Sequence, residues 1–108
     1  MNVDDYQKSA LRTASVHNCQ YDMLRDAAYG LNGEAGEVID ILKKHEFQGH
    51  ELDVAHVKEE LGDVAWYLAL ACSALGVHMS EILQANIDKL YKRYPTGFSA
   101  DRSINREV

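Results

Sequence analysis

Apolar side chains recur every three or four residues along most of this 108-residue chain. The longest series runs from Leu24 to Leu42, and shorter series with the same spacing lie on either side of it. A spacing of three and four places side chains on one face of an α-helix, whereas a strand alternates at every second residue. Because only seven glycines and one proline interrupt the pattern, we expect an all-α fold.

Capping residues and helix breakers divide this pattern into four predicted helices. The helices are expected at residues 4–16, 22–44, 53–75 and 80–94. Gly76 is the predicted left-handed cap of the third helix, and Pro95 ends the fourth. The chain is long enough for one domain, residues 1–108. Its polar, aperiodic end, residues 96–108, is expected to form a carboxyl-terminal arm.

The third predicted helix contains a segment, Val64–Cys72, that is apolar around the whole helix. A four-helix bundle-like protomer would leave one side of this helix in water. We therefore expect a helical dimer or a dimer of dimers, in which a second copy covers that side. The segment is far shorter than the roughly 20 residues of a membrane span, and the first residues do not resemble a secretion signal. No membrane association and a cytoplasmic location are therefore expected.

The formal net charge is −6, from 11 basic and 17 acidic residues. Binding a nucleic-acid polymer requires a basic surface, so no such partner is expected. Free nucleotides remain candidate ligands, since a bound cation reverses the local charge. Cys19 and Cys72 lack the spacing of a metal knuckle or a redox pair and are expected to be reduced thiols.

Two pairs of acids lie among the apolar residues of the second and third predicted helices: Glu34 with Glu37, and Glu60 with Asp63. A separation of three places both members of a pair on one face, and packed helices lie about 8 to 10 Å apart. Inward carboxylates from the two helices could then reach a common ion. Surface acids show the same spacing by chance, but two pairs within apolar stripes favour a metal site.

The ligand chemistry indicates which metal. Carboxylates are hard donors that suit Mg²⁺, with Mn²⁺ as a substitute, whereas zinc sites favour Cys and His. Helical di-iron proteins use Glu-x-x-His, and no histidine lies three residues after Glu34 or Glu60. Mg²⁺ bound by a few carboxylates keeps positions open for substrate phosphates. A polyphosphate substrate is therefore expected.

Two further patterns have two interpretations each. Lys89 and Arg93 lie four residues apart and could bind the phosphates together, although a solvated helix face explains this spacing equally well. Gly30, Gly33 and Gly36 disfavour a helix. They indicate either a close helix approach or room for a ligand beside the acids, and the two are compatible.

Three segments together resemble the MazG-like nucleotide pyrophosphohydrolases of the all-α NTP pyrophosphatase superfamily: GLNGEAGEVIDILKK, EELGDVAWYLALA and NIDKLYKRYPTGFS. The resemblance covers about residues 6–106, and the RYPTGFS segment resembles short, stand-alone, phage-like members. It implies helical dimers or dimers of dimers and dependence on Mg²⁺. It also implies cleavage of (deoxy)nucleoside triphosphates to monophosphates and pyrophosphate.

The resemblance also implies roles for single residues. The metal ligands would be Glu34, Glu37, Glu60 and Asp63, and the phosphate-binding basic pair would be Lys89 and Arg93. Glu59 matches an extra acid that some members use near a second ion, and Tyr67 resembles a nucleotide contact.

Other assignments stay open at this point. Glu34 or Glu37 would orient or deprotonate the attacking water, and the sequence does not choose between them. Tyr6, Gln7 and Trp66 are candidates for base or sugar contacts, and packing explains each equally well. Two alternatives to an enzyme are a non-catalytic module that binds metal and nucleotide, and a structural dimer whose acids face solvent.

Overall fold

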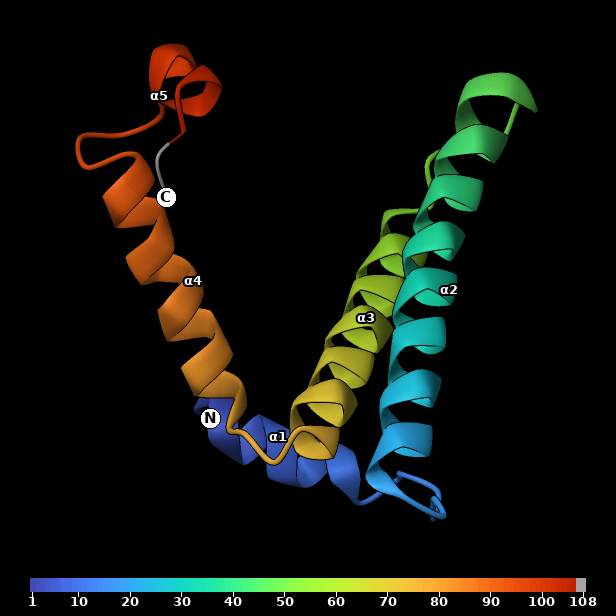
Figure 1. Cartoon of the computed structure of the whole chain (residues 1–108). Coiled ribbons are helices and arrows are strands. Elements are labelled where there is room, and N and C mark those ends of the chain that lie inside the picture. Colours follow the sequence, from blue (N-terminus) through green and yellow to red (C-terminus); the bar gives the residue numbers. More distant parts are fainter. Residues whose placement is uncertain (107–108) are drawn as a thin grey trace.

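A computed structural model describes residues 1–106, which form five helices and no strand (Figure 1). The helices are α1 (Val3–Leu11), α2 (Gln20–Phe47), α3 (Val54–Ala74), α4 (Met79–Arg93) and α5 (Ala100–Ile104). The predicted all-α fold is confirmed. Within these residues, no single helix is both long and apolar enough to cross a membrane. Helices α3 and α4 meet the two criteria when taken together, but they are bent by 101° relative to each other.

Helices α2 and α3 lie side by side as an antiparallel hairpin (Figure 1). Ala27 of α2 and Ala69 of α3 are fully buried. Gly30 permits a close approach between the helices, because a Cβ built there would lie 2.1 Å from the ring of Tyr67. The close-approach interpretation therefore holds at Gly30, whereas a Cβ at Gly33 would meet open space.

Helix α1 crosses the base of the hairpin and connects it to α4 (Figure 1). The buried Gln7 makes this connection with three hydrogen bonds. Its Nε2 donates to Ser73 Oγ and to the Val77 carbonyl, both at 3.0 Å, and its Oε1 accepts from the Met79 N–H at 2.7 Å. The side chain of Gln7, a candidate for contact with a base or sugar, is thus hydrogen-bonded within the fold through both its nitrogen and its oxygen.

The corner between α3 and α4 has its own local causes. Gly76 adopts φ 70°, and the Val77 N–H donates to the Cys72 carbonyl at 3.0 Å, which closes the last turn of α3. Helix α4 then starts against α1, where Asp4 accepts hydrogen bonds from the Ser80 N–H at 3.1 Å and the Ser80 hydroxyl at 2.7 Å. Asp4, a residue of α1, thus caps the start of α4.

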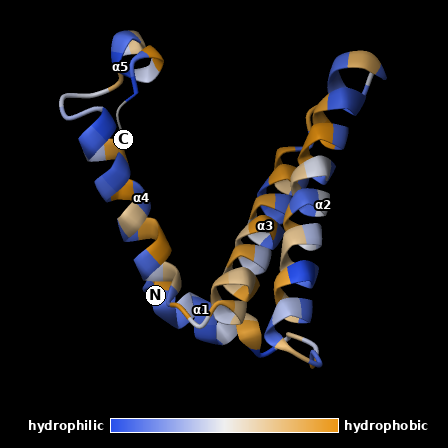
Figure 2. Ribbon diagram, in the orientation of Figure 1, coloured by the Kyte–Doolittle hydropathy of each residue, from blue (hydrophilic) through white to orange (hydrophobic). Residues whose placement is uncertain are grey.

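Beyond its first turns, α4 diverges from α2 and α3, which gives the chain an open V shape (Figure 1). The Cα radius of gyration is 17.1 Å, against about 13 Å for a compact domain of this length. Figure 2 shows hydrophobic residues recurring along α4. Five large apolar side chains of this helix are exposed: Ile82, Leu83, Ile87, Leu90 and Tyr91. Within one chain, then, α4 does not close a bundle, and the oligomeric assembly stays a prediction.

The first helix ends at Leu11, five residues before its predicted end. In a longer helix, the Ala10 carbonyl would accept from the Ala14 N–H. It accepts instead from Trp66 Nε1 at 2.9 Å and from the Thr13 hydroxyl at 3.0 Å. Contact with α3 therefore stops α1 early. The other predicted boundaries differ from the structure by no more than three residues.

The predicted arm contains a short helix, α5, that the sequence analysis missed. The Ser99 side chain caps it by accepting from the Arg102 N–H at 3.4 Å. The Arg102 guanidinium also donates to the carbonyls of Lys92 and Arg93, and so caps the end of α4. Residues 107 and 108 of the predicted arm lie outside the described residues.

Candidate metal centre

Three carboxylates from α2 and α3 converge on one point. Glu34, Glu60 and Asp63 each offer an oxygen that lies within 4.8 Å of the other two. Glu60 and Asp63 are one turn apart on α3, and Glu34 faces them from α2. Glu34 and Glu60 are partly buried, whereas Asp63 is exposed. The hairpin thus brings together three of the four acids predicted to bind a metal; we call these three the carboxylate trio.

The fourth acid, Glu37, lies one turn further along α2 with an exposed side chain. It is not among the carboxylates that meet within 4.8 Å. Its charge still acts on the trio, because it contributes to the raised pKa of Glu34. A direct role for Glu37 in metal binding stays a prediction.

The surroundings of Glu34 raise its pKa from 4.5 to about 7. The largest cause is a hydrogen bond with Glu60, followed by burial and then by the charges of Glu60, Asp63 and Glu37. That hydrogen bond exists only while one carboxyl group carries a proton, since two carboxylates only accept. With both groups ionised, Glu60 Oε2 is buried without a hydrogen-bond partner among residues 1–106. A proton or a cation therefore belongs between these groups, and hard oxygen donors fit a divalent ion such as Mg²⁺.

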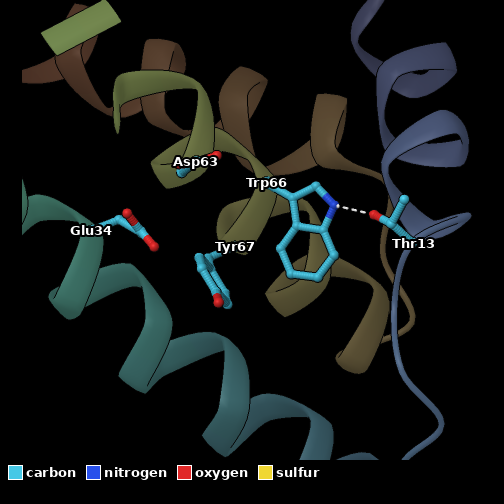
Figure 3. Close-up of a pocket in the computed structure, with 5 residues that line it drawn as sticks. All are labelled: Thr13, Glu34, Asp63, Trp66 and Tyr67. Atoms are coloured by element: carbon cyan, nitrogen blue, oxygen red, sulfur yellow. Dashed lines mark hydrogen bonds between the residues drawn. The ribbon is translucent and has the colours of Figure 1, made fainter. Parts of the chain in front are cut away.

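A pocket of about 340 Å³ adjoins the trio (Figure 3). Its lining residues are Thr13, Glu34, Asp63, Trp66 and Tyr67. The rings of Trp66 and Tyr67 meet edge to face, with their centroids 5.0 Å apart. Among residues 1–106, the lining has an aromatic wall, two acids and no basic side chain. An anion would therefore bind here only together with cations.

Trp66 and Tyr6, two candidates for base or sugar contacts, are partly buried. The Trp66 indole N–H donates to the Ala10 carbonyl and, at 3.0 Å, to the Thr13 hydroxyl. Only its ring therefore remains available in the pocket. Tyr6 packs against the buried cluster at the base of the hairpin. Burial, and then the charge of Asp63, raises the pKa of Tyr6.

The remaining predicted site residues lie apart from the trio. Glu59 is exposed and lines a separate hollow of about 400 Å³ with Asp53, Ala55 and His56. Lys89 and Arg93 lie in the last turns of α4, on the other limb of the V (Figure 1). The fold therefore does not bring this basic pair to the carboxylates of the same chain.

The sequence analysis missed one residue beside the trio. His56 Nε2 lies 3.1 Å from Glu60 Oε1. The two residues are four apart on α3, a spacing at which helical side chains meet. That spacing is the signal that could have identified His56.

The fold and the site define an all-α protein whose helical hairpin gathers carboxylates suited to a divalent cation. Residues 25–98 match the MazG nucleotide pyrophosphohydrolase domain. The chain is also 34% identical over 116 residues to the Gene 37 protein of Mycobacterium phage L5, covering 98% of this chain and 100% of the phage protein. No solved structure matches. The chain belongs to the MazG nucleotide pyrophosphohydrolase family.

Proposed function

We propose that this chain is a Mg²⁺-dependent nucleoside triphosphate pyrophosphohydrolase that cleaves (deoxy)nucleoside triphosphates to monophosphates and pyrophosphate. The observation that carries the proposal is the convergence of Glu34, Glu60 and Asp63 beside a pocket, in a chain of the MazG family. Mn²⁺ is the proposed substitute for Mg²⁺, because both take oxygen ligands.

The trio, with Glu37 beside it, would hold the divalent ion. When bound, that ion supplies positive charge that neutralises the triphosphate and polarises its phosphoryl oxygens. Either Glu34 or Glu37 is the proposed group that orients or deprotonates the attacking water. The water oxygen bonds to the α-phosphorus, and the bond from the α-phosphorus to the bridging oxygen breaks. Pyrophosphate leaves with that electron pair, and the water proton passes to a carboxylate.

The pocket beside the trio is the proposed site of the nucleoside. Its volume of about 340 Å³ lies within the usual range for small-molecule sites. Tyr67 and the ring face of Trp66 offer flat apolar surfaces for a base or sugar. Exposed Glu59, next to Glu60 in the chain, is proposed to approach a second ion.

A second copy of the chain is the proposed source of the phosphate-binding Lys89 and Arg93. Two observations support this homodimer, alone or within a dimer of dimers. The apolar face of α4 is exposed, and exposed patches of this kind mark association surfaces. The pocket is lined by acids, and the basic pair lies on the other limb of the same chain. In a two-fold dimer each basic limb would meet the acidic hairpin of its partner.

Product analysis tests this proposal. The protein is incubated with each common NTP and dNTP and Mg²⁺, and the products are separated. We expect monophosphate and pyrophosphate, and a loss of at least ~100-fold in rate in Asp63→Asn. The matched control is Asp40→Asn in α2, where Asp40 forms an ion pair with Lys44 at 3.1 Å and is not one of the trio. Diphosphate and orthophosphate as products, or full activity in Asp63→Asn, would contradict the proposal.

The alternative is a module that binds metal and nucleotide without turning the nucleotide over. It gives a different result in the same samples. A triphosphate with Mg²⁺ would raise the melting temperature, and no product would appear after long incubation.

A further inference from the structure

The two carboxylate oxygens of Glu60 have different surroundings. Oε1 lies 3.1 Å from His56 Nε2, and a carboxylate only accepts, so the imidazole donates. Oε2 is buried and has no hydrogen-bond partner among residues 1–106. Only 12% of the Glu60 side chain is exposed, so water reaches it poorly. One oxygen is thus held by the protein, and the other is left for an ion or a proton.

His56 is itself fixed by the start of α3. Its backbone N–H donates to Oδ1 of the N-cap residue Asp53 at 3.1 Å, which sets where the helix begins. This bond fixes the backbone of His56 in the first turn, at a spacing from Glu60 at which helical side chains meet. The side chain of His56 is 44% exposed, and its contact with Glu60 Oε1 sets its position.

His56 lies outside the pocket beside the trio. Along the axis of α3 it precedes Glu60 by about 6 Å, at 1.5 Å per residue. Trp66 and Tyr67, which line that pocket, follow Glu60 by roughly 10 Å in the opposite direction. The exposed edge of His56 opens instead on the hollow that includes Glu59. A nucleoside in the pocket would therefore not touch His56.

We propose that His56 is a positioning residue for the metal ligand Glu60. By donating to Oε1 it restricts rotation of the carboxylate and directs Oε2 to the ion. Donors of this kind orient metal ligands from outside the coordination sphere, and removing one weakens metal binding by about 10- to 100-fold. The inference rests on the proposed function, because it takes Glu60 to bind the ion.

Calorimetric titration with Mg²⁺ and with Mn²⁺, without nucleotide, tests the role directly. His56→Ala should weaken the binding of both ions by about 10-fold. His56→Gln should restore binding to within about threefold, since a glutamine amide four residues before an acid also donates to it. His50→Ala is the matched control, because His50 is exposed and lies before α3. It should bind as the parent does.

Either of two results would overturn the inference. They are unchanged affinity in His56→Ala, or binding by His56→Gln that is as weak as binding by His56→Ala. Far-UV circular dichroism in chelator establishes that each variant is folded.

Glu60→Gln separates this inference from the proposed function. If Glu60→Gln binds metal as the parent does, the metal site itself is wrong. If Glu60→Gln loses binding while His56→Ala retains it, only the positioning role is wrong.

Discussion

The α2–α3 hairpin and helices α4 and α5, together called the α4–α5 arm from here on, differ in their packing. Among the described residues, the hairpin helices pack against each other, whereas α4 leaves apolar residues exposed. The two hairpin helices face each other along their length, and Gly30 lets them approach at Tyr67. Helix α4 packs on α1 and α3 only near its start and leaves its apolar residues exposed. The packing of the hairpin is therefore accounted for within one chain, whereas the exposed apolar residues of α4 are the basis of the proposed dimer.

The predicted site residues of opposite charge also lie in different regions. The hairpin carries the acidic trio, and five of the 11 basic residues follow position 88: Lys89, Lys92, Arg93, Arg102 and Arg106. A site for a metal-bound triphosphate needs both signs. In one copy the predicted basic pair, Lys89 and Arg93 of α4, lies on a different limb from the trio. The proposed assembly of two or more chains rests on this comparison, and the following experiments test it.

The largest expected effect is complementation between two inactive chains. Glu60→Gln removes a proposed metal ligand, and the double variant Lys89→Ala/Arg93→Ala removes the proposed phosphate-binding cations, so each alone should lose at least ~100-fold in rate. If the arm serves its partner, a mixed dimer has one intact site and one doubly defective site. An equal mixture should therefore regain about a quarter of parental activity.

The matched control mixes Glu60→Gln with Asp63→Asn, both in the hairpin, and should stay inactive. If the mixture of hairpin and arm variants also stays inactive after subunit exchange, the arm does not complete its partner's site.

Gln7→Ala should loosen the joint between the regions. Gln7 is buried and bonds Ser73, Val77 and Met79, so its truncation leaves buried polar groups without partners. The expected loss in the free energy of unfolding is about 1 to 3 kcal/mol, measured by urea denaturation. Lys8→Ala, at the exposed neighbouring position, should change it by less than about 0.5 kcal/mol. Equal stability of the two variants would contradict the claim that Gln7 joins α1 to the start of α4.

Two glycine variants should change the stability of the fold in opposite directions. Gly30→Ala places a Cβ against Tyr67, which forces the ring or the helices to shift at a cost of roughly 1 to 2 kcal/mol. Gly33→Ala meets open space in the chain and should stabilise it by up to about 1 kcal/mol through helix propensity. Thermal unfolding measures both. A gain in Gly30→Ala would show that the hairpin is looser than described.

The smallest expected effect is on pH dependence. Because the pKa of Glu34 is raised from 4.5 to about 7, the folded chain holds a proton in this window that the unfolded chain has lost. Metal-free stability therefore falls as pH rises from 4.5 to about 7. Mg²⁺ replaces the proton, so stabilisation by Mg²⁺ grows over the same window. Melting temperatures with chelator and with Mg²⁺, at about pH 5.5 and 7.5, measure both trends.

The control for this prediction is Glu34→Gln, which should flatten both trends. The lowered pKa of Asp4, caused first by its hydrogen bond from the Ser80 side chain, acts in another range. Its stabilisation is lost only as pH falls below about 3.8. Unchanged trends in Glu34→Gln would assign the window to a different group.

Periodicity predicted the helices because helical spacing and caps are local properties. The convergence of Glu34, Glu60 and Asp63 was predictable for the same reason, since two amphipathic helices joined by a short connection pair as a hairpin. The early end of α1 was not, because it depends on Trp66, which is 56 residues from Ala10.

The direction of α4 was also beyond the sequence pattern. It is set by hydrogen bonds that Gln7 and Asp4 accept from the backbone N–H groups at the start of the helix, and neither residue carries a motif for that contact. A polar residue at a helical surface position gives the same pattern whether it bonds water or a distant backbone group. The structural roles of Gln7 and of the corner between α3 and α4 are therefore visible only in the folded structure.

Equilibrium titration with Mn²⁺, with the free ion measured by electron paramagnetic resonance, tests the central claim most directly. The parent protein should bind Mn²⁺ stoichiometrically and release it to Mg²⁺. Glu34→Gln and Asp63→Asn should each bind at least ~10-fold more weakly, and Glu46→Gln, an exposed acid of α2, should bind as the parent does. Equal Mn²⁺ binding by the parent and by both trio variants would contradict the claim that these carboxylates hold the ion.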